Sequence, residues 1–214
     1  MRATAIAIAS ALICAGTLAA ETRVVSTTIK GETKLRSSIY REEAEGAFLR
    51  IREEAEDGSV EALLAADGTV ASTDLRTKDG DVRMSSDGKV VDISGTWRGK
   101  PVSGRYELKG LGFYGSGFTF ALRALAKGGL SALRFPMIDV AKPEKSAVME
   151  LRREGTDSFK GKLAIKVKIS LTGVMSALWS GHILIGEDGM FLRYEGNQGP
   201  GTPTMVSELV EIKK

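Results

Sequence analysis

The chain has 214 residues, of which 43% are hydrophobic, and it carries 30 lysines and arginines against 27 aspartates and glutamates. The resulting formal net charge of +3 is too small for a dedicated nucleic-acid-binding protein, which usually presents a strongly basic face. With 25 glycines, 5 prolines and interspersed charges, the composition is typical of a β protein with many turns and excludes a disordered chain.

The first twenty residues have the pattern of a secretory signal peptide. Arg2 supplies a positive charge, residues 3–14 are small and apolar, and residues 17–20 offer small side chains for cleavage. The apolar run is too short to span a bilayer, and no later segment approaches that length. We therefore expect residues 1–20 to be a cleaved signal peptide. Residues 21–214 are then a single β-rich domain in a bacterial periplasm, without a transmembrane segment.

Cys14 is the only cysteine, and it lies inside this apolar run. Ile13 before it is bulkier than the small residue of a lipoprotein signal, so lipidation is not expected. The mature chain then has no disulfide, no thiolate metal site and no cysteine nucleophile. About 190 residues are enough for one ordinary domain to build its own core.

Five Asp-Gly dipeptides predict tight hairpin turns, because both residues tolerate positive φ. The first four are spaced as in a meander of short strands. A calcium loop is not predicted, because no segment has the alternating ligands and final glutamate of an EF-hand. The dipeptides begin at Asp57, Asp67, Asp79, Asp87 and Asp188.

Alternating apolar and polar residues between the turns predict about ten to thirteen strands of an antiparallel sheet with one wet face. Lys162–Leu171 shows the alternation most clearly, with lysines opposite the apolar residues. The candidate segments are residues 23–29, 33–41, 47–54, 59–65, 70–76, 82–85, 90–97, 102–108, 132–138, 147–153, 162–171, 181–185, 190–195 and 205–212.

One helix interrupts the strands, within the segment Gly110–Ile138. Ser116 can cap its start and Gly128 can end it, which predicts a helix near Ser116–Lys127. An amphipathic helix beside a sheet must lay its apolar face on that sheet. The predicted fold class is all-β, a strongly curved antiparallel sheet or open β-barrel with one main helix packed on or plugging it. The apolar face consists of Phe118, Ala121, Leu122, Leu125 and Ala126, with Arg123 and Lys127 off that face.

No motif predicts catalysis. His182 is the single histidine, so it cannot supply a multi-histidine zinc site. A catalytic triad could use only this histidine, but no segment resembles a nucleophile elbow, and a structural role is expected. The glycines between Gly110 and Gly117 resemble a phosphate cradle but lack a parallel βαβ context. The acidic runs near Glu42 and Glu53 are expected at solvated strand ends, although paired carboxylates can hydrolyse glycosides. We therefore expect no enzyme, no cofactor and no metal.

A cavity between sheet and helix would suit an acyl chain or another apolar ligand. Large apolar side chains, Phe120 among them, could line it, and a filled core is the alternative for each. The candidate ligand-binding residues are Trp97, Phe113, Tyr114, Phe118, Leu122, Leu125 and Trp179.

The order of these segments, with EDGMFLRYEG at residues 187–196 and SELVEI at residues 207–212, resembles uncharacterised periplasmic all-β proteins that carry a domain of unknown function. Those proteins are similar in shape to the LolA and LolB lipoprotein carriers. The resemblance implies an open, barrel-like sheet with a helical plug and a role in the cell envelope, and it implies no catalytic residue.

Two functions remain open. The first is a periplasmic binding module that carries or senses an apolar, lipid-like ligand or a lipidated partner. The second is a non-enzymatic envelope interaction or structural protein with a filled core. Its unclosed sheet edge or its lysine face would engage a partner protein.

Overall fold

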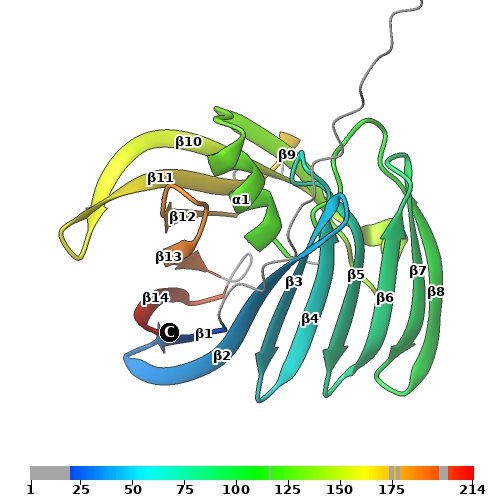
Figure 1. The fold of residues 1–214 in the computed structure, drawn as a ribbon, viewed down its shortest axis with the longest axis horizontal. Coiled ribbons are helices and arrows are strands. Elements are labelled where there is room, and N and C mark those ends of the chain that lie inside the picture. Colours follow the sequence, from blue (N-terminus) through cyan, green and yellow to red (C-terminus); the bar gives the residue numbers. More distant parts are fainter. Residues whose placement is uncertain (1–19, 116, 174–175, 177–178, 198–201) are drawn as a thin grey trace, which may run out of the picture.

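The computed structural model describes residues 20–115, 117–173, 176, 179–197 and 202–214. Within these residues, fourteen strands form one antiparallel sheet, and a single α-helix accompanies it (Figure 1). The predicted fold class is therefore confirmed. The fourteen strands exceed the expected total of about ten to thirteen by one, because every one of the candidate segments becomes a strand. The elements are β1 (Glu21–Ile29), β2 (Glu32–Glu45), β3 (Phe48–Ala55), β4 (Gly58–Leu64), β5 (Val70–Thr77), β6 (Gly80–Ser86), β7 (Val90–Trp97), β8 (Lys100–Glu107), α1 (Thr119–Lys127), β9 (Ala132–Met137), the 3-10 helix η1 (Pro143–Lys145), β10 (Ala147–Phe159), β11 (Lys162–Leu171), β12 (Ser180–Ile185), β13 (Phe191–Asn197) and β14 (Thr204–Lys213).

The first and last strands are neighbours in the middle of the sheet. The strand order is β8-β7-β6-β5-β4-β3-β2-β1-β14-β13-β12-β11-β10-β9, so β8 and β9 are opposite edges although they follow one another in the chain. The sheet is not closed, and it curves around α1, which lies in the connection between these edges (Figure 1). Pro136 lies in β9, an edge strand, where a sheet tolerates a residue without a backbone N–H.

The five predicted Asp-Gly turns all lie at hairpin connections. Their glycines have positive φ angles, as tight turns require; examples are Gly68 at 84° and Gly189 at 82°. The meander β2–β8 results directly from these turns, because each antiparallel strand returns beside the one before it.

The inner face of the sheet, the face toward α1, carries two main cores. The N-terminal core covers β2–β7 and includes Leu108 and Phe113 from the connection before α1. The C-terminal core covers β9–β13 and includes the apolar face of α1. The predicted alternation is confirmed here: Ile51, Val91 and Ile93 are buried, whereas the residues beside them in the chain are not.

Helix α1 begins at Thr119, later than predicted. Phe118 occupies the capping position without a side-chain hydrogen bond, and the expected cap, Ser116, lies outside the described residues. The predicted end is confirmed, because the N–H of Gly128 donates to the carbonyl oxygen of Ala124 at 2.9 Å. Ala121, Leu122, Ala124 and Leu125 are buried. None of the helices in the described ranges has the length and apolar character to cross a membrane.

Two strands extend by four or more residues beyond their predicted ends. β2 continues to Glu45, so its acidic residues lie within a strand and not beyond its end. β10 passes through a bulge at Arg153–Gly155 and continues to Phe159. The end of the β10–β11 hairpin packs against β13 and β14, where Ala164 is buried in a third, smaller cluster with Leu192 and Leu209. Leu163, beside Ala164 in the chain, is 65% exposed instead of facing the core.

Candidate functional site

A cavity of about 370 Å³ lies on the inner face, where the N-terminal and C-terminal cores meet. Its floor is formed by β1, β2 and β14, and its roof by the start of α1 and the β12–β13 turn. These strands come from the two ends of the chain and are neighbours only because β1 pairs with β14. The cavity therefore exists only once the sheet has been assembled.

One wall of the cavity is apolar. It combines side chains from the approach to α1 with side chains from β13, β14 and the turn before β13. Two aromatic rings from the start of the helix face methionine and leucine side chains of the sheet, a surface suited to a hydrocarbon chain. The wall consists of Val25, Phe118, Phe120, Met190, Phe191, Met205 and Leu209.

The opposite wall is polar because of the sequence of two strands. In β2, Arg36, Ser38, Tyr40 and Glu42 are spaced two apart, so they project from the same face. Arg23 occupies the inner face of the neighbouring strand, opposite Ser38. Charged and hydroxyl groups therefore replace apolar ones on the inner face at this point of the sheet.

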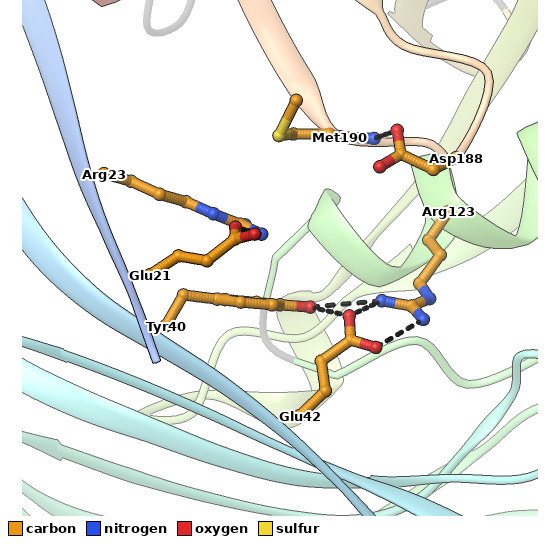
Figure 2. A network of polar contacts seen from close by, with 7 residues as sticks. All are labelled: Glu21, Arg23, Tyr40, Glu42, Arg123, Asp188 and Met190. Atoms are coloured by element: carbon orange, nitrogen blue, oxygen red, sulfur yellow. Dashed lines mark hydrogen bonds and ion pairs between the residues drawn. The ribbon is translucent and has the colours of Figure 1, made fainter. Parts of the chain in front are cut away.

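Helix α1 is tied to the polar wall by a network around Glu42 (Figure 2). Arg123 donates hydrogen bonds through both terminal nitrogens to Glu42; the bond from Nη2 to Oε2 measures 3.0 Å. Tyr40 donates to Oε1 of Glu42 at 2.5 Å and accepts from Arg123 at 3.1 Å. The side chains of Arg123 and Glu42 are 15% and 16% exposed, so the ion pair is largely shielded from water.

The network shifts the pKa values of its members. Burial alone would raise the pKa of the Glu42 carboxyl, but hydrogen bonds from Arg123 and Tyr40 outweigh it, and the pKa lies below its usual value. Burial and the hydrogen bond to Glu42 both raise the pKa of Tyr40 above its usual range. Burial lowers the pKa of Arg123, yet the bond to Glu42 produces a net rise. At neutral pH Glu42 is therefore ionised and Tyr40 is protonated.

Arg23 extends across the ring of Tyr40 (Figure 2), with its guanidinium carbon 3.4 Å from the ring centroid. Its Nη2 donates to Oε2 of Glu21 at 3.3 Å. Its Nε is buried and has no hydrogen-bond partner among the described residues. A buried donor on a charged group is costly to leave unpaired, and water cannot relieve this cost because the atom has almost no accessible surface.

A second cavity, of about 450 Å³, lies at the other end of α1. It is bounded by the β2–β3 and β4–β5 turns and by the last turn of the helix. Arg123 lines both cavities, whereas Glu42 lines only the first. The guanidinium group of Arg123 therefore lies between the two cavities.

Two Asp-Gly turns hold the helix from opposite sides. A Cβ added at Gly189 would lie 2.4 Å from Cα of Arg123, and one added at Gly68 would lie 3.0 Å from Cβ of Ala124. Only glycine permits such a close approach of turn and helix. The helix is thus clamped at its centre by one turn from each half of the sheet.

The structure distributes the seven expected site residues over both cores. Phe118 alone lines the first cavity. Tyr114, Leu122 and Leu125 are buried in the C-terminal core, and Trp179 packs against that core while its indole N–H donates to the carbonyl oxygen of Asn197 at 2.8 Å.

The remaining two expected residues belong to the N-terminal core. Phe113 is buried in it, and Trp97 packs against it. Phe113 also borders a smaller cavity of about 270 Å³. The large aromatic side chains of the sequence therefore do not gather at one site.

Sequence reasoning missed the polar side of the cavity: Arg23, Tyr40, Glu42 and Arg123. One signal was present, because the alternation in residues 36–42 places Arg36, Tyr40 and Glu42 on the face that is apolar elsewhere. Ending the predicted strand before Glu42 concealed it. The position of Arg123 off the apolar helical face was correctly predicted, but its buried partner was not.

The features that resembled catalytic motifs lie in ordinary positions of the fold, one on a strand and the other in a connection. His182 is 49% exposed, with Nε2 3.4 Å from Oε2 of Glu154. The glycines between Gly110 and Gly117 connect β8 to α1, and all strand pairs in the described sheet are antiparallel, so they are not part of a βαβ unit.

Comparison with protein-family models and with curated protein sequences finds no match. Among solved structures, a β-barrel-like protein of a domain of unknown function, DUF1849, from Brucella abortus is similar with a TM-score of 0.58 and 11% sequence identity. The similarity covers 92% of this chain and 98% of that chain. At this identity it shows the fold alone, and the predicted resemblance to uncharacterised β proteins is confirmed at that level.

Two further similarities have TM-scores too low to carry an argument. A DUF1329 family protein from Desulfovibrio piger has a TM-score of 0.28 and 9% identity, over 91% of this chain and 84% of that chain. A domain from Vibrio parahaemolyticus, described as an outer membrane lipoprotein-sorting protein domain, has a TM-score of 0.26 and 7% identity over the same shares. The class that the fold and the cavity define is an open, barrel-like β protein with an enclosed helix.

Proposed function

We propose that this protein is an exported binding protein that holds an apolar, lipid-like ligand, or the lipid chain of a partner, in the cavity between β1, β2, β14 and the start of α1. One observation carries the proposal: an apolar wall of aromatic, methionine and leucine side chains faces a space of about 370 Å³. This volume lies within the range of about 300–1,000 Å³ that is usual for small-molecule sites.

The rest of the inner face supports this assignment. Leu122 and Leu125 on the helix are buried against side chains, and Phe113 before it borders only the smaller cavity. The first cavity is bordered instead by Phe118 and Phe120, which pack only in part against the cores. A guest chain would complete the burial of these two rings and gain about 25 cal/mol for each Å² of apolar surface removed from water.

Introducing a charge into the apolar wall tests the proposal. Met205→Lys places an ammonium group in the cavity, and Val206→Lys places the same group on the opposite face of β14, because successive side chains alternate across a strand. We expect the wild-type protein and Val206→Lys to bind the neutral apolar dye N-phenyl-1-naphthylamine, and Met205→Lys to lose binding while remaining folded by circular dichroism. Equal binding by both variants would place the dye elsewhere and contradict the proposal.

Native mass spectrometry of protein purified from its host adds a second test, since a lipid-sized adduct is expected on the wild-type chain and not on Met205→Lys. N-terminal sequencing of the same material tests export, with residue 21 expected as the first residue. A chain that begins at Met1 in the cytoplasm contradicts export.

An envelope interaction protein is the alternative, and the free outer edges of β8 and β9 favour it. Neither strand has a second neighbour within the described sheet, and an unpaired edge offers backbone groups to another strand. If the wild-type protein binds no apolar probe and carries no lipid, this alternative is the better account.

A further inference from the structure

We infer that the ion pair of Glu42 and Arg123 limits the length of the apolar chain that the first cavity accepts, because it closes a groove that otherwise continues into the second cavity. The inference rests on the proposed function and identifies the residues that set the chain length of its ligand. It starts from the position of Arg123, which lines both cavities while its guanidinium group is bound to Glu42.

The two cavities follow the same row of side chains on β2. Tyr40 and Glu42 line the first cavity, and Ala44, the next residue on the same face of the strand, lines the second. At about 3.3 Å for each residue, Glu42 and Ala44 are about 7 Å apart along the strand. The strand therefore passes from one cavity to the other without interruption.

Helix α1 lines both cavities on the other side. Phe120 borders the first cavity, Ala124 and Lys127 border the second, and Arg123 borders both. From Phe120 to Lys127 the helix rises by only about 10 Å. The two cavities are therefore successive parts of one groove between β2 and α1, and the side chain of Arg123 crosses this groove from the helix to Glu42 on the strand (Figure 2).

The second cavity offers an apolar chain further surface to bind. Small and large apolar side chains from both turns and from the helix contribute to its lining. Phe48 is 41% exposed there, so a guest chain would remove additional apolar surface from water. A chain that continued beyond Glu42 would thus gain further affinity. The apolar lining includes Ala44, Ala47, Phe48, Leu49, Leu64 and Ala124.

The ion pair is suited to end the first cavity because it is costly to open. Its two side chains are largely shielded from water, and Tyr40 forms hydrogen bonds with both. A chain that separated Glu42 from Arg123 would leave two largely buried charges unpaired, and methylene groups offer them no hydrogen bond in return. We therefore expect a long chain to stop at the pair and to leave its remaining carbons in water.

A series of neutral alkanols tests the inference: octanol, decanol, dodecanol, tetradecanol and hexadecanol, each below its solubility limit and measured by displacement of N-phenyl-1-naphthylamine. For the wild-type protein we expect the affinity to rise about 15-fold with each added pair of methylene groups and to level off before hexadecanol. The double variant Glu42→Ala and Arg123→Ala removes both side chains together, so that no buried charge is left unpaired. Its affinity should continue to rise beyond the wild-type limit.

Two further variants distinguish an opened groove from a loosened helix. The double variant Asp92→Ala and Arg105→Ala is the matched control, because it removes an exposed ion pair of the N-terminal half, and it should keep the wild-type limit. Adding Ala44→Phe to the double variant of Glu42 and Arg123 fills the second cavity and should restore the wild-type limit.

Thiol labelling tests the inference with the ion pair intact. Each protein carries Cys14→Ala, which removes the only cysteine, together with Met205→Cys in the first cavity or Ala44→Cys in the second. At a tetradecanol concentration about ten times its dissociation constant, maleimide labelling of the Met205→Cys protein should slow about 10-fold, by mass action. Labelling of the Ala44→Cys protein should not change.

The outcomes separate this inference from the proposed function. An affinity that rises through hexadecanol in the wild type, the same limit in the wild type and the double variant, a limit that Ala44→Phe does not restore, or protection of the Ala44→Cys thiol overturns the inference while the proposed function stands. If circular dichroism shows that the double variant does not fold, the two labelling rates decide by themselves. Absence of wild-type binding for every alkanol overturns the proposed function as well.

Discussion

The N-terminal and C-terminal halves of the sheet are covered in different ways. Over the N-terminal half, the cover consists of single side chains from irregular connections: Leu108 and Phe113 before α1, and Ile138 and Val140 after β9. Over the C-terminal half, the cover is the apolar face of α1. Both covers come from the stretch between β8 and η1, so one connection closes both halves and leaves the cavity at the junction between them.

The difference between the two covers explains how a cavity can persist in a well-packed protein. A helix is stiff and has one apolar face, so it cannot also fill the space over β1 and β2. Its other side is held by Arg123 bound to Glu42 and by the turns at Gly68 and Gly189. A polar clamp therefore positions the helix at the junction, where apolar packing is incomplete.

The largest expected effect comes from Leu122→Asp, which removes the apolar cover of the C-terminal half. Leu122 is fully buried, and a carboxylate without a partner there should lower the free energy of unfolding by about 3–5 kcal/mol. Urea denaturation is the measurement. A folded variant of ordinary stability that binds more hydrophobic dye would show instead that the helix is a movable lid over a hollow.

The same variant tests whether the halves are energetically separate. The chain has two tryptophans, with Trp97 beside the N-terminal core and Trp179 beside the C-terminal core. Leu122→Asp is therefore combined with Trp97→Phe or with Trp179→Phe, so that the remaining tryptophan reports the unfolding of one half. Because β1, β2 and β14 continue the sheet across the junction, we expect both proteins to have the same urea midpoint. Two distinct midpoints would show that each half unfolds with its own cover.

A smaller effect is expected from Glu42→Gln, which weakens the clamp and leaves both covers intact. Arg123 then keeps a largely buried charge without its ionised partner, and we expect a loss of about 1–3 kcal/mol of stability. Asp92→Asn is the control, since Asp92 and Arg105 form an ion pair that is exposed on the N-terminal half and should change stability little. Equal midpoints for the two variants in urea would contradict the clamp.

The contribution of Glu42 should also depend on pH in a defined direction. Its pKa in the folded protein lies below the ordinary value of 4.5. A lowered folded pKa adds stability that is fully present above the unfolded value and is lost as the pH falls through the folded value. The stability difference between the wild type and Glu42→Gln should therefore shrink below about pH 4.5, while carboxyl groups common to both proteins cancel. A difference that stays constant down to pH 3 would contradict this assignment.

The smallest effect is expected at Gly88, one of three turn glycines with nearly the same φ: Gly88 at 85°, Gly68 at 84° and Gly189 at 82°. Gly88→Ala should lose about 1–2 kcal/mol, the cost of a left-handed conformation for alanine, and the other two alanine variants should lose more because the added Cβ also meets the helix. Gly88 has open space around it, Gly68 approaches Ala124, and Gly189 approaches the backbone of Arg123 most closely. The midpoint temperature of thermal unfolding should therefore be lowest for Gly189→Ala, higher for Gly68→Ala and highest for Gly88→Ala. Equal midpoints would mean that the close approach of the turns to the helix does not affect stability.

Much of the fold could be predicted from local pattern. Lys162–Leu171 and Val90–Trp97 were predicted with the bounds that the structure has, because an alternation of two residues is a property of the segment itself. The Asp-Gly turns and the end of the helix at Gly128 were predicted for the same reason. Leu163 was predicted to face the core and does not, since its neighbour Ala164 is buried there instead, against Leu192 and Leu209 of distant strands.

The candidate site was harder to predict than the fold, because the sequence pattern of a large apolar residue is the same whether its side chain lies in a core or lines a cavity. Leu122 and Leu125 were expected to touch a ligand and are covered by the C-terminal core, whereas Phe118 does border the cavity. The polar wall was missed because a glutamate such as Glu42 is normally solvated, and only its partner 81 residues away removes it from water.

The sequence by itself determined which segments become strands, where the chain turns, and which face of the helix is apolar, because these depend on residues close together in the chain. Tertiary structure decided that β1 pairs with β14, bringing Thr27 to Ser207 across 180 residues, and that Arg23 and Tyr40 stack on the floor of a cavity. The physical reason is that such pairings depend on which surfaces remain to be buried after the local elements have formed, and that choice belongs to the whole chain.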